Sequence, residues 1–151
     1  MQLTPVSNPR ILHRERPDNR TIEFSTERID ELYNESLAAI PFDSSTNWEG
    51  WLKYSVEKGE LEQCTIKIDG EPIGLITYAF TGAKFKELLI STAYIRPQHF
   101  DFIPVMTAFA KKIARENNCD FIRFHTARKG LVKRALEMGF HVSEIVCRLT
   151  L

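Results

Sequence analysis

Ile95-Arg96-Pro97-Gln98-His99-Phe100-Asp101-Phe102-Ile103-Pro104-Val105 is the stretch of sequence that decides the fold. The largely apolar residues 85–95 lead into it and predict a strand, and apolar spacing after it predicts a helix over residues 102–113. A helix that begins where a strand ends offers unpaired amides and a positive dipole end, which suit a phosphate. However, no glycine lies between Gly82 and Gly130 to let the backbone approach a phosphate closely. The stretch therefore has the surroundings of a phosphate site but not its usual residues.

Hydrophobic spacing and turn signals predict the elements on either side of this stretch. Before it we expect a strand at 21–25, helices at about 25–40 and 46–59, and a hairpin of residues 61–68 and 73–80. After it we expect a strand at 119–125, a helix ended by Gly139, and a last strand at 140–151. The fold class is α/β (α+β), with a mixed, largely antiparallel central sheet of about six strands flanked by four helices.

The length of 151 residues fits one domain, which we assign to residues 21–151. Residues 1–20 contain prolines and arginines without periodicity, and we expect them to form an extended N-terminal arm. Such an arm is a candidate contact with a protein partner or with a second copy of the chain.

The composition indicates the cellular compartment of the protein and the kinds of partner that it is not expected to bind. The cysteines, Cys64, Cys119 and Cys147, are odd in number and stand among apolar residues, which indicates buried thiols in a reducing compartment. No segment approaches the roughly 20 apolar residues of a membrane span, and the N-terminus lacks a signal peptide pattern. We therefore expect a cytoplasmic protein without membrane contact. The basic residues of 111–134 have no interleaved aromatic residues on one face, so nucleic acid is not an expected partner, and no residues have metal-ligand spacing.

Three short motifs carry a family resemblance. Ile95-Arg96-Pro97 looks like a strand end before a cofactor loop, residues 135–140 look like a helix end ahead of a final strand, and Glu71-Pro72-Ile73-Gly74 looks like a hairpin. In this order and spacing they resemble the GNAT (GCN5-related N-acetyltransferase) superfamily over roughly residues 20–151. The resemblance implies a GNAT-like sheet and the transfer of an acetyl group from acetyl-CoA to an amine.

The resemblance also implies a loop whose main-chain amides bind the pyrophosphate of acetyl-CoA. The implied cofactor-binding residues are Ile95, Arg96, Asp101, Phe102, Ile103, Val105, Arg128 and Lys129. The chain departs from the family pattern, because Phe100, Ile103 and Val105 replace polar or small residues, Asp101 is negative and Pro104 has no N–H. The same residues suit an ordinary helix start, with Asp101 as N-cap and Pro104 in the first turn.

The family's general acid is often a tyrosine on the last helix, at a position that is Ala135 here. A working enzyme would therefore use other groups, and the catalytic candidates are Glu87, Tyr94 and His125. Glu87 would act as a general base, Tyr94 would donate a proton, and His125 would do either. The structural alternatives are an exposed strand residue for Glu87, a packing residue for Tyr94 and a strand-end histidine for His125.

Two functions remain open from the sequence. The first is a GNAT-like N-acyltransferase with acetyl-CoA as cofactor, an amine as substrate and a divergent cofactor loop. The second is a non-catalytic GNAT-fold assembly or interaction protein, for example a phage virion or host-modulating protein, located in the host cytosol or in the virion. The cofactor loop and the missing general acid favour the second, whereas the order of elements favours the first.

Overall fold

The computed structural model describes residues 10–13, 20–39, 48–126, 129–145, 147, 149 and 151, with the backbone alone at 10–13 and 48–51. Its strands are β1 (Arg10–His13), β2 (Thr21–Ser25), β3 (Glu62–Ile68), β4 (Glu71–Thr81), β5 (Glu87–Ile95) and β6 (Phe121–Phe124). They form one six-stranded sheet in sequence order. Each neighbouring pair is antiparallel except β5 and β6, which are parallel. The predicted fold class, a mixed and largely antiparallel sheet, is confirmed.

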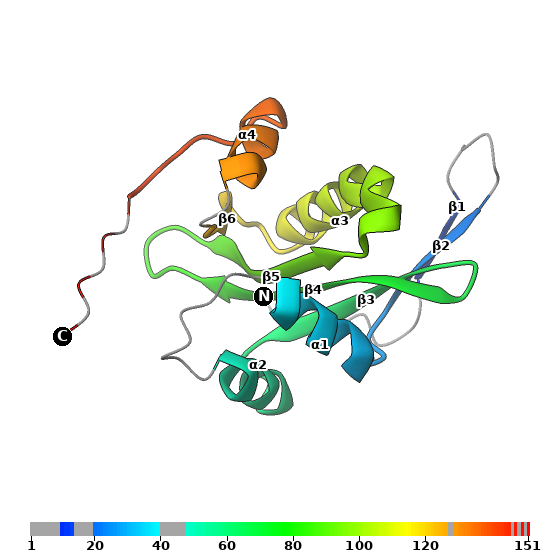
Figure 1. The fold of residues 1–151 in the computed structure, drawn as a ribbon. Coiled ribbons are helices and arrows are strands. Elements are labelled where there is room, and N and C mark those ends of the chain that lie inside the picture. The colour runs from blue at the N-terminus through cyan, green and yellow to red at the C-terminus, as the bar shows by residue number, and fades with distance from the viewer. Residues whose placement is uncertain are drawn as a thin grey trace.

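Helices cover both faces of this sheet. They are α1 (Asp30–Ala39), α2 (Trp48–Glu57), α3 (Ile103–Glu116) and α4 (Lys129–Glu137), and a 3-10 helix, η1 (Pro97–Phe102), precedes α3. In Figure 1, α1 and α2 lie on one face, and α3 and α4 lie on the other. In the described part of the chain, no helix is both long enough and apolar enough to cross a membrane.

Local signals explain the turns that join these elements. The β3–β4 hairpin turns at Asp69 and Gly70, both with positive φ, as a type I′ turn requires. After α4, Gly139 has φ +93°, and the N–H of Phe140 donates to the Ala135 carbonyl at 3.0 Å, which is the Schellman pattern of a helix end. Both turns were predicted from their glycines.

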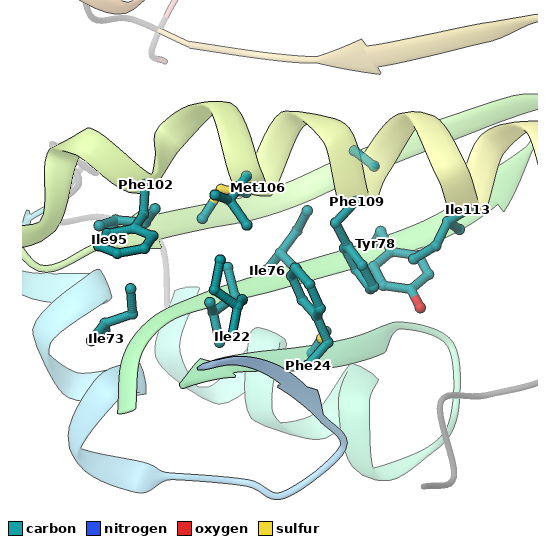
Figure 2. Packing of buried hydrophobic residues seen from close by; sticks show 14 of the residues in the cluster. Ile22, Phe24, Ile73, Ile76, Tyr78, Ile95, Phe102, Met106, Phe109 and Ile113 are labelled. Atoms are coloured by element: carbon teal, nitrogen blue, oxygen red, sulfur yellow. The ribbon is translucent and has the colours of Figure 1, made fainter. Parts of the chain in front are cut away.

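The main hydrophobic core lies between the sheet and α3. Apolar side chains of α3 point down onto the strands, and Phe109 stacks on Phe24 with ring centroids 4.3 Å apart (Figure 2). The side chains that the predicted helix face contributes are all buried, namely Phe102, Met106, Phe109, Ala110 and Ile113. A second, smaller cluster between the sheet and α1 and α2 contains Leu32, Tyr33, Leu52, Leu61 and Leu75.

The predicted last strand is wrong in the part that the structure describes. Residues 140–145, 147, 149 and 151 form no strand, and Ile145 and Leu149 are exposed. The segment touches β6 through side chains, because the rings of Phe140 and Phe124 lie 5.3 Å apart. β6 has only four residues and offers few ladder bonds to a further strand. Without that neighbour β6 is an edge strand, and it is not buried as predicted.

Two smaller predictions also need correction, and the predicted arm is described only in part. α1 begins at Asp30 and not at Ser25 or Thr26, because the Ser25 hydroxyl accepts the Glu27 N–H in a local turn at the end of β2. Only Cys64 is a buried thiol, whereas Cys119 is half-buried and Cys147 is exposed. Within the predicted arm, residues 10–13 pair with β2, and residues 1–9 and 14–19 lie outside the described residues.

Candidate functional site

The candidate site is built around the place where β5 and β6 separate. The two strands pair in parallel up to Ile90↔Phe124, where β6 ends. β5 continues to Ile95 and still pairs with β4 along its other edge. From Ser91 onward, the β6 side of β5 has no strand partner among the described residues. We call this place, beyond Ile90 and Phe124, the fork.

A β-bulge lies at the fork. Thr77 of β4 pairs with Thr92 of β5, whereas the next residue of β4, Tyr78, pairs with Ile90. Ser91 is therefore an extra residue in β5. A bulge shifts the alternation of side chains by one residue, so it changes the face on which the following side chains lie.

The bulge brings Tyr94 to the α1 face of the sheet. Leu88, before the bulge, belongs to the core under α3, whereas Tyr94 packs against the cluster that contains Leu32 of α1. The Tyr94 hydroxyl donates to Oε2 of Glu35 at 3.1 Å. Burial, followed by the hydrogen bond to Glu35, raises the pKa of Tyr94, so its phenol keeps its proton at neutral pH.

Arg96 holds the same corner of the molecule together. Its Nε and Nη2 donate to the two carboxylate oxygens of Glu35 at 2.9 and 2.8 Å, and its Nη1 donates to the Pro72 carbonyl at 2.9 Å. The hydrogen bond from Arg96 lowers the pKa of Glu35, which stays a carboxylate. This network joins α1 to the end of β5. The predicted cofactor contact of Arg96 would have to compete with these bonds.

The start of α3 was the predicted phosphate site. Phe102 holds the N-cap position without a side-chain capping bond, and the Ile103 N–H donates to the Phe100 carbonyl inside η1. Pro104 supplies no amide. The prediction of Asp101 as N-cap is wrong by one position, and the Asp101 carboxylate instead pairs with Arg20 at 3.8 Å. The amides of residues 103 and 104 are therefore not available to an anion.

The side chains of this turn face the protein interior or the solvent. Phe102 is fully buried under α3, where Figure 2 places it above Ile95 and Ile73, and Val105 is also buried. Ile103 packs partly against the same core, whereas Phe100 is half exposed. Phe102 and Val105 therefore anchor the turn to the core.

A second polar network surrounds the end of β6. Nε of Arg123 lies 3.1 Å from Oε2 of Glu87, as an ion pair that is not aligned as a hydrogen bond. Nη1 of Arg123 donates to Oε1 of Glu144 at 3.2 Å, and Nε2 of His125 lies 3.1 Å from the same oxygen. Hydrogen bonds from His125 and then from Arg123 lower the pKa of Glu144.

The structure brings some of the predicted residues together and separates others. Glu87 and His125 share the network around Arg123, whereas Tyr94 lies seven residues along β5 from Glu87, or about 23 Å at about 3.3 Å per residue. Lys129 is exposed at the start of α4, and Arg128 lies outside the described residues. Sequence reasoning missed Glu35 and Glu144, since no motif marks a lone glutamate as the partner of a distant side chain.

A shallow surface depression lies at the opposite end of β5. It is open to solvent and is lined by Phe80, Thr81, Gly82, Ala83, Lys84, Lys86 and Asp120. One carboxylate oxygen of Asp120 accepts the Lys86 N–H at 3.1 Å, so this acid joins the residues that precede β5 and β6. The depression is remote from Tyr94 and from the start of α3, because it lies at the other end of β5.

No family model and no curated protein matches the chain. Solved structures do match it. A GCN5-related N-acetyltransferase from Ralstonia eutropha has a TM-score of 0.65 at 18% identity, covering 85% of this chain and 98% of that chain. A predicted acetyltransferase from Clostridium acetobutylicum, solved with acetyl-CoA, has a TM-score of 0.64 at 13% identity, covering 85% and 96%.

An aminoglycoside antibiotic 6′-N-acetyltransferase from Acinetobacter haemolyticus is also similar, with a TM-score of 0.61 at 15% identity and coverage of 85% and 96%. These identities are low, so the likeness concerns the arrangement of the elements and does not extend to activity or substrate. The sheet order, the parallel β5–β6 pair and the helices on both faces agree with it. The chain therefore has the fold of the GCN5-related N-acetyltransferases.

Proposed function

We propose that the chain is an N-acyltransferase that transfers an acetyl group from acetyl-CoA to an amine. The observation that carries the proposal is the fork with its bulge at Ser91, which leaves backbone groups of β5 without a strand partner beside the end of β6. Bulges are frequent next to active sites because they redirect the backbone and end pairing. The similar Clostridium acetobutylicum protein was solved with acetyl-CoA, which supports the choice of acyl donor.

The fork suits the thioester end of the acyl donor. A backbone N–H fixed in a sheet stabilises the negative charge that develops on the thioester carbonyl oxygen when an amine attacks its carbon. The Thr77 hydroxyl, opposite Thr92, is buried and has no hydrogen-bond partner among the described residues. Such an unpaired buried hydroxyl costs about 1–3 kcal/mol.

The diphosphate end of acetyl-CoA fits the chain less well. The start of α3 supplies the positive end of a helix dipole, but the Ile103 amide is engaged and Pro104 has none. The carboxylate of Asp101 also opposes an anion at this position. We therefore expect the thioester end, and not the diphosphate, to supply most of the binding free energy.

Acetyl transfer also moves protons. The attacking amine must lose a proton, for which Glu87 and His125 are the candidates, and the departing thiolate must gain one. Tyr94 keeps its phenolic proton and lies on β5 beyond the fork, so it is the candidate donor to the thiolate, for which its hydrogen bond to Glu35 must open.

The start of α3 favours a second function. The Phe100–Ile103 hydrogen bond engages the Ile103 amide, Pro104 has no N–H, and the buried Phe102 anchors the turn to the core. A chain with these contacts and no donor site would be a non-catalytic protein of the same fold that acts by binding a protein partner. Acetyl-CoA turnover separates the two functions.

The experiment measures release of free coenzyme A thiol from acetyl-CoA in the presence of a panel of amines, with mass spectrometry of the acetylated product. Wild type should release thiol only when an accepted amine is present. Ser91→Pro, which removes the backbone N–H at the bulge, should abolish the release, whereas the matched Ser91→Ala should keep it. Circular dichroism of both variants controls for folding. Equal turnover in the two folded variants would refute the role of the fork, and no turnover with any amine would favour the second function.

A further inference from the structure

The network at the end of β6 distinguishes between the two candidate bases. Glu87 is one quarter exposed, and its carboxylate faces Nε of Arg123 at 3.1 Å. The guanidinium and the partial burial of Glu87 both limit the access of an amine to this carboxylate. Glu87 therefore neutralises Arg123 at the start of β5, several residues before the fork.

His125 has a different position. It follows Phe124, the last residue of β6, so it stands at the fork one residue beyond the final β5–β6 pair. Its side chain is 59% exposed, which gives a substrate access to the ring. Because Glu144 ionises readily and a carboxylate only accepts hydrogen bonds, Nε2 of His125 must be the donor in the 3.1 Å contact.

Glu144 is itself held in place. The same oxygen that faces His125 accepts a hydrogen bond from Nη1 of Arg123 at 3.2 Å, and Arg123 is in turn paired with Glu87. A chain of three charged side chains from β5, β6 and the C-terminal segment thus ends on one nitrogen of an imidazole. Fixing the hydrogen on Nε2 leaves Nδ1 as the ring nitrogen with a lone pair.

We propose that His125 is the general base of the acetyl transfer and that Glu144 is a positioning residue that holds its imidazole through Nε2. The inference rests on the proposed function, and it adds to it the choice of His125 over Glu87. The contact with Glu144 uses Nε2, so Nδ1 is the ring nitrogen that would face the amine.

The step balances as follows for a neutral amine. The amine nitrogen attacks the thioester carbon, the C–N bond forms, and Nδ1 takes one proton from that nitrogen. The C–S bond then breaks with its electron pair on sulfur, and the thiolate receives a proton from Tyr94 or from the imidazolium. The products are the N-acetylated amine and coenzyme A with a free thiol.

The first test determines which ring nitrogen of His125 carries the hydrogen, and it does not require acetyl transfer. Nitrogen-15 NMR of the full chain is recorded about two pH units above the ordinary imidazole pKa of about 6.5, where histidine is neutral. His125→Gln assigns the signal, and the exposed His141 is the internal reference. In wild type the two ring nitrogens of His125 should show the full shift separation of a pure Nε2–H form.

Two variants test whether Glu144 causes the shift separation between the ring nitrogens of His125. Glu144→Ala should reduce it to the value for His141, whose tautomers interchange freely. The matched control Glu137→Ala, which removes an exposed carboxylate of α4 outside the network, should leave it unchanged. An equal separation for His125 and His141 in wild type would overturn the inference, as would a separation unaffected by Glu144→Ala.

The second test uses turnover. Glu144→Ala should lower kcat by about 10-fold to 100-fold, a part of the about 10²–10⁴-fold that a general base supplies, while KM for acetyl-CoA stays within about twofold. Glu144→Gln still accepts a hydrogen bond and should restore part of the loss. A loss confined to KM, or an equal loss in Glu137→Ala, would contradict a positioning role. If wild type transfers no acetyl group, the proposed function fails, whereas the NMR test still decides whether Glu144 holds His125.

Discussion

The pair between Arg96 and Glu35 should be a major contributor to stability, and Arg96→Ala tests it. The change removes two charge-assisted hydrogen bonds to Glu35 and one to the Pro72 carbonyl. Breaking a fully buried pair costs about 3–5 kcal/mol, whereas an exposed pair contributes about 0–1 kcal/mol. Because Arg96 is 16% exposed and Glu35 is 29% exposed, we expect a loss of about 2–3 kcal/mol.

Urea unfolding at neutral pH measures this loss. With a slope of about 1–3 kcal/mol per molar urea, the midpoint should fall by about 1–2 M. The matched control is Arg28→Ala, because Arg28 also pairs with two acids, Asp30 and Glu57, but these carboxylates are 73% and 63% exposed. Its loss should be below about 1 kcal/mol. Equal losses in the two variants, or a loss below about 0.5 kcal/mol for Arg96→Ala, would refute the reasoning.

The same pair should give a defined pH dependence. Because Arg96 lowers the pKa of Glu35 in the folded chain, the stability from the pair is fully present above the ordinary carboxylate pKa of about 4.3. It is lost as the pH falls through the lowered pKa of Glu35. The difference between wild type and Arg96→Ala should therefore shrink in acid. A constant difference from neutral pH down to acid unfolding would show that Glu35 is not the partner that matters.

Burial and backbone geometry also determine the stability contributed by Phe102 and Gly82 and the reactivity of Cys64. Phe102→Ala should lower the free energy of unfolding by about 3–5 kcal/mol, because the ring is fully buried. Phe100→Ala removes a half-exposed ring and should lower it by less than about 1 kcal/mol. Similar losses for the two variants in urea titrations would contradict the buried position of Phe102. Gly82→Ala should destabilise the β4–β5 turn, because φ is +101° and a Cβ would lie 1.8 Å from the Phe85 carbonyl oxygen. An unchanged melting temperature of this variant would contradict the described backbone conformation of the turn. Burial raises the pKa of Cys64 to about 12, so at pH 8 a thiol reagent should label the exposed Cys147 and leave Cys64 intact in the folded chain, as peptide mass spectrometry would report.

Much of the scaffold could be predicted because it depends on local signals. The alternation around Ile66 and the Asp69-Gly70 turn specify the hairpin, and the spacing from Phe102 to Ile113 specifies the buried face of α3. The predicted connection from strand to helix at residues 95–103 is present, and η1 lies between the two elements. Each of these features is determined by residues close together in the chain.

Other features depend on residues far apart in the chain, and the sequence pattern does not reveal them. The bulge at Ser91 exists only in relation to the register of β4, and Arg96 meets Glu35 across 61 positions. Asp101 lies one residue too early to cap α3, because η1 extends to Phe102. The predicted strand at 140–151 had the right alternation, but a strand also needs a neighbour with enough residues to pair, and β6 has four.

The measurement that tests the central claim most directly is a calorimetric titration of acetyl-CoA into the purified chain. We predict heat that fits one site, with binding kept in Ser91→Ala and lost in folded Ser91→Pro, because the fork supplies the contact with the thioester. Coenzyme A without the acetyl group should bind more weakly than acetyl-CoA. No heat at millimolar acetyl-CoA would contradict the acyltransferase account.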